Sequence, residues 1–450
     1  MLLQKIVGMK KSDFDVIVNE KKDIFLRPAR LIPIYKPGDE ISLTSIFLRS
    51  LCLIKEFKDL FFSEVKISKS GKIFTYTEVT LKQYEGIRID GLLLEVRSGI
   101  IKDAVIFEMK NKNNEIDKTQ IEKYAQCAKD LNIPKLITVS NQFVSKPTQS
   151  PISVKTPKCV ELYHFSWSYL LTIAHVLLFD NEINIKDPDQ VEIMKEVVAY
   201  LENNISGVCG FTKMKPGWKD VVDKINSGSR LKQTDLFVID TVTSWQQEER
   251  DMALILSRKL GLFVKTGSAK YKHDLQLRID NDVKTLITNK LLMSTLKVSG
   301  AVSDILIKAL FDKRTIEMSV RLNVPIDKTV RGQIGWLKRQ VDKCLKKNEE
   351  KFNELSHDIM IDIYIKHAKG PIRIHSKNIE NIYPDIKNKE IKEFGVVLVK
   401  DFGKGFSSSK KFVEIIESML LDYYKVIVQY LTNWEKPAPK IPENETTIEE

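Results

Sequence analysis

The stretch from residue 88 to residue 124 constrains the fold more than any other part of this chain. It contains two runs of branched, apolar residues, 89–96 and 104–107, joined by a polar turn that includes Gly99. Such runs on either side of a glycine-containing turn predict two antiparallel strands. The segment that follows has apolar residues at helical spacing and ends near Leu131. The chain is therefore expected to build a sheet with an amphipathic helix next to it.

Acidic residues lie at the ends of these two strands. Asp90 is at the start of the first, and the second ends in Glu108-Met109-Lys110. Antiparallel pairing can bring Asp90 near Glu108, and alternation along a strand puts Glu108 and Lys110 on one face. Two neighbouring carboxylates repel each other, and a divalent cation removes that conflict. Carboxylate oxygens, completed by a carbonyl and waters, suit Mg²⁺ or Mn²⁺.

Together with Gln120-x-x-x-Tyr124 on the following helix, these residues resemble the PD-(D/E)xK nuclease superfamily and its RecB-like branch. Gln120 and Tyr124 are one helical turn apart and share a face, as that motif requires. The chain has Ile89-Asp90 where the family commonly has Pro-Asp. The tripeptide E-x-K alone carries little information, because it recurs at Glu56 and Glu349. The combination of strand, acid and helix motif carries the resemblance.

The resemblance implies roles for these residues. Asp90, Glu108 and the Met109 carbonyl would hold Mg²⁺ or Mn²⁺, and Lys110 would position the nucleophilic water. Gln120 and Tyr124, on the following helix, would hold the metal ligands or the phosphate in position.

Members of the superfamily often add an acid from the helix before the sheet. The candidates here are Glu56, with Glu64 behind it, and Glu78 on the first predicted strand. For Glu56, an exposed glutamate on a helix is the alternative interpretation.

The implied activity is metal-dependent hydrolysis of phosphodiester bonds in DNA, in a defence or repair setting. Two alternatives remain at this stage. One is an RNase, and the other is a catalytically silent nucleic-acid-binding or protein-interaction module on the same fold. Mn²⁺ binding through Asp90 and Glu108 would separate the enzyme from the silent module.

Periodicity predicts the order of elements around this stretch. A helix from Ser42 to about Val65 precedes a strand at 72–80, and the Asn132-Ile133-Pro134 break precedes a strand beginning at Leu136. The order is helix, three strands, helix, strand, which indicates an α/β fold. The resemblance names it a restriction-endonuclease-like α-β-β-β-α-β core. A further strand at 160–165 and a helix at 167–179, capped by Ser166, complete this region.

Five segments are predicted along the chain: an N-terminal arm (1–40), the nuclease-like domain (41–185), a mainly helical region (186–290), a C-terminal α+β domain (291–434) and a disordered tail (435–450). In the C-terminal domain, alternation predicts strands at 316–322, 359–365 and 395–399, and a helix at 330–341. The last helix, 410–434, is apolar enough to serve as a docking element or as the interface of a homodimer.

Basic residues accompany the helix at 330–341. Arg331 and Lys338 flank its apolar stripe, and Arg339 lies opposite. They are candidate contacts to a nucleic-acid backbone, with a solvated helix face as the alternative. The formal net charge of +11 favours a polyanionic partner, although a lysine-rich composition alone also accounts for it.

Composition excludes several classes of protein. The five cysteines are scattered without metal-binding spacing, which argues against a zinc site or a disulfide framework. The sequence has no apolar run of membrane-spanning length, so a cytoplasmic location without membrane association is expected. His164 and His175 are interpreted as packed histidines. Three segments (140–143, 160–167 and 210–218) resemble a bacterial family labelled as stress response proteins.

Overall fold

The computed structural model describes residues 5–18, 24–29, 38–84, 86–112, 114–144, 146–267 and 274–435. They form two compact units. Unit 1 comprises residues 1–218 and 240–266, and unit 2 comprises residues 219–239 and 267–450. The described residues contain helices and two β-sheets, so the predicted α/β class is confirmed. Residues 436–450, most of the predicted disordered tail, lie outside the described part.

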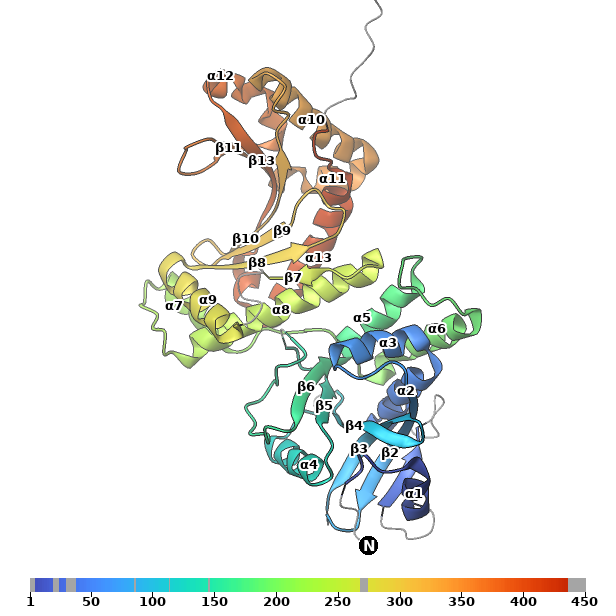
Figure 1. Cartoon of the computed structure of the whole chain (residues 1–450). Helices are drawn as coiled ribbons and strands as arrows, with labels where there is room; N and C mark the ends of the chain where they lie inside the picture. Colours follow the sequence, from blue (N-terminus) through green and yellow to red (C-terminus); the bar gives the residue numbers. More distant parts are fainter. Residues whose placement is uncertain are drawn as a thin grey trace, which may run out of the picture. The chain divides into compact units, whose positions relative to one another are not determined.

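Unit 1 is built on a six-stranded sheet with the strands in sequence order (Figure 1). Strands β1 to β4 pair antiparallel, and β4, β5 and β6 pair parallel. Their bounds are β1 Ile24–Pro28, β2 Lys72–Leu81, β3 Arg88–Arg97, β4 Ile100–Met109, β5 Lys135–Ser140 and β6 Glu161–Ser166. The predicted β3–β4 hairpin is confirmed. Its two-residue turn has positive φ at both positions, Ser98 (51°) and Gly99 (73°), which matches the twist of the paired strands.

Helices cover both faces of this sheet, as Figure 1 shows. On one face, α4 (Lys118–Asp130) packs its apolar side chains against the inward residues of β3 and β4. On the other face, α2 (Glu40–Leu53), α3 (Lys55–Glu64), α5 (Trp167–Leu178) and α6 (Pro188–Glu202) share a second core. A Cβ built on Gly91 would lie 2.9 Å from a Leu48 methyl, so α2 sits directly on β3. The short α1 (Lys11–Val16) buries Phe14 in the first core.

The predicted order of elements is observed, with one correction. The single helix predicted from Ser42 to Val65 is two helices, because Ile54 is extended (φ −117°, ψ 106°). The first of them also begins earlier than predicted, at Glu40. Side-chain caps start α4 and α5, among other helices: Asp117 accepts the Gln120 N–H (2.7 Å), and Ser166 accepts the Tyr169 N–H (3.1 Å). The predicted Ser166 cap is thus confirmed.

Two further helices, α7 (Gly217–Asn226) and α8 (Leu236–Leu260), cross the division between the units. In unit 1, the C-terminal part of α8 is tied to α5 by buried polar contacts. Asp251 accepts the Ser168 hydroxyl (3.0 Å), and Arg258 donates to the Thr172 hydroxyl (2.8 Å). The short strand β7 (Lys265–Thr266) ends this part of the chain.

Unit 2 contains an antiparallel sheet in the order β12-β11-β13-β10-β9-β8. Its elements are α9 Leu275–Asn289, β8 Leu291–Lys297, β9 Ile305–Leu310, β10 Thr315–Asn323, α10 Val330–Lys347, α11 Glu349–Leu355, β11 Ile359–Ile365, β12 Ile372–His375, α12 Tyr383–Ile386, β13 Ile391–Asp401 and α13 Ser409–Val426. The three predicted strands and the helix beginning at Val330 are confirmed, whereas β8, β9 and β12 were not predicted.

The last helix differs from its prediction. It ends at Val426 rather than at Trp434, and its apolar residues, among them Phe412, Ile416 and Leu420, are buried within unit 2. The homodimer stays a prediction. Among the helices of the described residues, none combines the length and the apolar character needed to cross a bilayer.

Candidate active site

The sequence-predicted residues Asp90, Glu108 and Lys110 come together at one end of the unit 1 sheet. The β3–β4 register pairs Gly91 with Phe107, so Asp90 and Glu108 face each other at the next position. The Met109 N–H donates to Asp90 Oδ2 (2.8 Å), and Lys110 Nζ lies 2.5 Å from Glu108 Oε1. Glu108 is fully buried. Two acids and a lysine therefore come together, with Glu108 fully buried and Asp90 and Lys110 half-buried.

The two carboxyls influence each other's protonation. Burial and the charge of Glu108 raise the pKa of Asp90 well above its usual range, although the Met109 N–H and Lys110 oppose this. Burial also raises the pKa of Glu108, with Lys110, Asp90 and Tyr124 acting in the opposite direction. Apart from the ion pair with Lys110, neither Glu108 oxygen receives a hydrogen bond of regular geometry from the described residues. The pair thus carries more negative charge than its protein surroundings stabilise.

Lys110 is fixed through its backbone. Its N–H donates to the Val139 carbonyl on β5 (2.8 Å), and its own carbonyl accepts the Trp167 indole N–H (2.9 Å) at the start of α5. Burial lowers the pKa of the Lys110 ammonium, but the nearby carboxylates of Glu108, Asp90 and Glu40 raise it by more. The lysine is therefore protonated at neutral pH.

The two predicted residues of helix α4, Gln120 and Tyr124, lie beside the acids. Gln120 Nε2 donates to the Tyr124 hydroxyl (2.9 Å), and that hydroxyl donates to the Arg88 carbonyl at the start of β3. Burial and the charge of Glu108 raise the pKa of Tyr124. Helix α4 thus presents Gln120 and Tyr124 toward the end of the sheet that carries Asp90 and Glu108.

Glu40 is a residue that sequence reasoning missed. At the first position of α2, its carboxylate accepts the Asn111 N–H (3.1 Å) and the Asn114 side-chain amide (2.7 Å), and its charge reaches Lys110. A helix start predicted at Ser42 left this acid in a loop. The acidic first turn of a helix was the signal that could have found it, since carboxylates are favoured there.

The other candidate acids lie elsewhere or are paired. Glu64 accepts the Tyr169 hydroxyl (3.1 Å), and Glu56 lies half-buried on α3. Glu78 pairs with Arg88 (3.2 Å), lies opposite Asp90 on β2 and has a positive φ of 56° where the β1–β2 register shifts. Among the described residues, no group of three or more His, Cys, Asp or Glu side chains could hold a metal ion. Of the predicted carboxylate ligands, Asp90 and Glu108 are the two that face each other without a basic partner between them.

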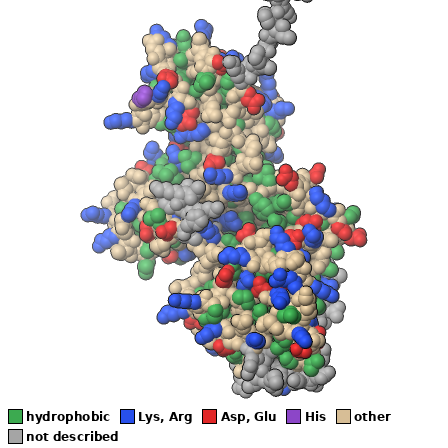
Figure 2. Space-filling model, in the orientation of Figure 1, with side chains coloured by type: hydrophobic (Ala, Val, Ile, Leu, Met, Phe, Trp, Pro, Cys, Tyr) green, Lys and Arg blue, Asp and Glu red, His purple; other side chains and the backbone are tan. Residues whose placement is uncertain are grey.

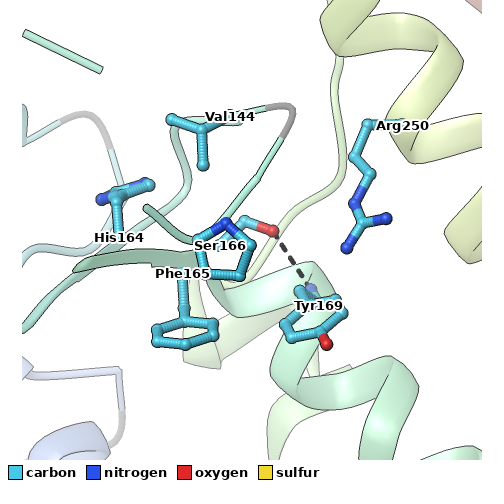
Figure 3. Close-up of a pocket in the computed structure, with 7 residues that line it drawn as sticks. Val144, His164, Phe165, Ser166, Tyr169 and Arg250 are labelled. Carbon is cyan, nitrogen blue, oxygen red and sulfur yellow. Dashed lines mark hydrogen bonds between the residues drawn. The ribbon is translucent and has the colours of Figure 1, made fainter. Parts of the chain in front are cut away.

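A small pocket opens farther along the same sheet edge, at the end of β6 (Figure 3). Its lining includes His164, Ser166, Tyr169 and Arg250. Its volume of about 10 Å³ is that of a single water molecule, so it does not take a substrate. His164 is fully buried and hydrogen-bonded through both ring nitrogens, to the Thr138 hydroxyl and the Gln142 carbonyl (both 2.8 Å), which confirms the packed interpretation.

The predicted nucleic-acid contacts lie on α10 in unit 2. Lys338 is ion-paired with Glu380 (2.8 Å). Arg339 is exposed, and its guanidinium lies 3.7 Å from the point where a Cβ on Gly335 would be. Arg331 is exposed and lies over the Tyr383 ring, 5.8 Å from its centroid. Over the face shown in Figure 2, lysines and arginines are interspersed with acidic side chains rather than gathered in one stripe. Net charge alone therefore does not identify a binding surface.

Comparison with known proteins gives no relative from which a role could be transferred: no protein-family model matches this chain, and neither does any curated protein or solved structure.

Proposed function

We propose that unit 1 is a metal-dependent nuclease of the PD-(D/E)xK type, with a restriction-endonuclease-like core, that hydrolyses phosphodiester bonds in DNA. The observation that carries the proposal is that Asp90 faces the fully buried Glu108 across the β3–β4 pair, with Lys110 ion-paired to the latter. A purely structural site would gain little from two facing carboxyls, because burial opposes the ionisation of both and the charge of Glu108 opposes that of Asp90 as well.

The residues present fit a hard divalent cation. The donor set consists of carboxylate oxygens, and the pKa of each carboxyl is raised, as expected where a positive charge is needed to balance them. Mg²⁺ is commonly held by one or two carboxylates together with waters and substrate phosphates, so a third protein carboxylate is not required. Asp90, Glu108 and the Met109 carbonyl would hold it.

When bound, the cation would supply Lewis-acid polarisation of the phosphoryl oxygen and a lowered pKa for an attached water. The chain's own residues then have distinct tasks. The Lys110 ammonium orients the attacking water and offsets negative charge on the scissile phosphate. Glu108 holds that ammonium in place, and Trp167 fixes the backbone of Lys110. Tyr124 and Gln120 keep the start of β3, and with it Asp90, in position.

The test is cleavage by the purified full chain on linear and circular, single- and double-stranded DNA, and on RNA, with Mg²⁺ or Mn²⁺. We expect Lys110→Ala and Asp90→Asn each to lower the rate by at least about 100-fold, the loss typical of removing one electrostatic contact to a transition state. The matched control is Lys351→Ala. Lys351 belongs to another E-x-K tripeptide and is ion-paired with Glu354 (2.7 Å) on the surface.

Unchanged cleavage in folded Lys110→Ala would exclude this site, and cleavage of RNA alone would replace DNA as the substrate. Intact circles beside degraded linear DNA would assign end-dependent action.

A further inference from the structure

Unit 2 contains a groove with no role in the proposed nuclease chemistry. It lies between α10 and the segment 380–384, and its volume is about 700 Å³. Pockets that bind small molecules commonly have volumes of about 300–1,000 Å³. The lining combines polar and apolar groups: Arg331, Ile334 and Gly335 from α10, and Glu380, Asn381, Tyr383 and Pro384 from the facing segment.

The glycine in this wall has no packing explanation. Gly335 is in the interior of an 18-residue helix, where glycine disfavours helix formation. A Cβ at this position would meet only the Arg339 guanidinium, at 3.7 Å, which is an ordinary contact. The φ of Gly335 is not positive, so the backbone does not require glycine either. What the missing side chain does provide is open space on the groove side of α10.

The charges in the groove favour an anion. Glu380 is neutralised by its ion pair with Lys338. Arg331 has no acidic partner among the described residues, and its guanidinium lies over the ring of Tyr383. The half-buried Tyr383 ring offers an aromatic face, and the exposed Asn381 offers an amide that can both donate and accept. An aromatic face, an amide and an uncompensated guanidinium are complementary to a base, its polar edge and a phosphate.

We propose that this groove binds a nucleotide, with the base against Tyr383 and Ile334 and the phosphate on Arg331. The ligand is either a free nucleotide or an unpaired nucleotide within a single strand, which share this chemistry. The proposal goes beyond the nuclease function and does not require it, because every residue involved lies in unit 2.

The test is fluorescence anisotropy with the full chain in EDTA, using fluorescently labelled adenosine monophosphate and labelled oligothymidylate as probes. Gly335→Leu fills the groove with a good helix former. We expect it to weaken binding of at least one probe by roughly tenfold, the loss of about one stacked base. Gly335→Ala, which leaves the space largely open, should bind like the wild type. Ribose 5-phosphate, which lacks a base, should compete poorly.

Arg331→Ala should also weaken binding and reduce its salt dependence, because the phosphate contact is lost. The charge control is Lys346→Ala, an exposed lysine at the far end of the same helix. A loss confined to the mononucleotide identifies a free ligand, and a loss that includes the oligonucleotide identifies a strand.

Wild-type binding of neither probe, or equal binding by folded Gly335→Leu, would overturn the proposal. Circular dichroism of that variant verifies the fold. Since EDTA prevents metal-dependent cleavage, a failed nuclease proposal leaves this outcome unaffected.

Discussion

Asp90 and Glu108 reduce the stability of the fold in the absence of a cation. Burial raises the pKa of both carboxyls, and the charge of Glu108 raises the pKa of Asp90 further. A carboxyl whose folded pKa is raised is most favourable to folding when it is protonated in both states, and its contribution falls as pH rises toward the folded pKa. This cost at neutral pH is typical of a site built to bind charge rather than to stabilise structure.

We therefore predict that Asp90→Asn stabilises the metal-free protein at neutral pH, by on the order of 1 kcal/mol. The asparagine oxygen can still accept the Met109 N–H, so only the charge is removed. The gain should disappear below about pH 3, where the wild-type carboxyl is protonated in both the folded and the unfolded state. Urea unfolding in EDTA at both pH values measures it, and a variant less stable than the wild type at neutral pH would contradict the stated pKa direction.

His164 should act in the opposite sense over part of the same range. Burial lowers its pKa from 6.5 to about 4. A buried neutral histidine contributes stability that is fully present above pH 6.5 and is lost as pH falls toward about 4, by roughly 3 kcal/mol in total. His164→Gln retains a donor for the Gln142 carbonyl. We predict that its free energy of unfolding falls less steeply than that of the wild type as the pH is lowered. The unfolding free energy as a function of pH measures this, and parallel profiles would contradict it.

Helix boundaries decided which acid reaches the site. Periodicity alone merges α2 and α3, because their apolar faces continue past Ile54. Where α2 starts depends on tertiary contacts: Asn111, which follows β4, donates through its N–H to Glu40 and through its amide to the Gly38 carbonyl (3.0 Å). The helical acid beside the lysine is therefore Glu40 rather than Glu56.

At the level of α10, the two glycines should respond differently to alanine. Gly335→Ala should stabilise unit 2 by up to about 1 kcal/mol, the intrinsic helix preference of alanine over glycine, because its Cβ position is open. Gly332→Ala should gain less, since its Cβ would lie 3.2 Å from the Lys328 Cβ. Thermal unfolding of the two variants makes the comparison, and a larger gain at Gly332 would argue against open space at Gly335.

Because the two units have separate sheets and cores, their unfolding need not be one transition. We predict that Mn²⁺ stabilises unit 1 alone. Its free energy of unfolding should rise by about 2.7 kcal/mol at a Mn²⁺ concentration of 100 times the dissociation constant. Asp90→Asn should abolish this shift, whereas Gly335→Leu should leave it intact. Calorimetry with and without Mn²⁺ measures the effect, and an equal metal-induced shift in Asp90→Asn would place the cation elsewhere.

The sequence by itself determined the local elements of this protein. Branched runs around Gly99 predicted the β3–β4 hairpin, and strand alternation predicted the central strands β10, β11 and β13 of unit 2. It also grouped Asp90, Glu108 and Lys110, because the two acids lie on paired strands whose register is set by buried faces and Lys110 directly follows the second strand. Such features depend on residues close together in the chain, so the spacing of apolar residues is enough to predict them.

Only the tertiary structure decided the rest. Glu40 approaches Lys110 because the Asn111 turn holds the start of α2, and the groove exists because Tyr383 faces Gly335 across a gap of nearly fifty residues. The buried state of Glu108, and with it the raised pKa, depends on α4 covering the sheet. Each of these is a contact between segments distant in sequence, whose geometry no local pattern encodes.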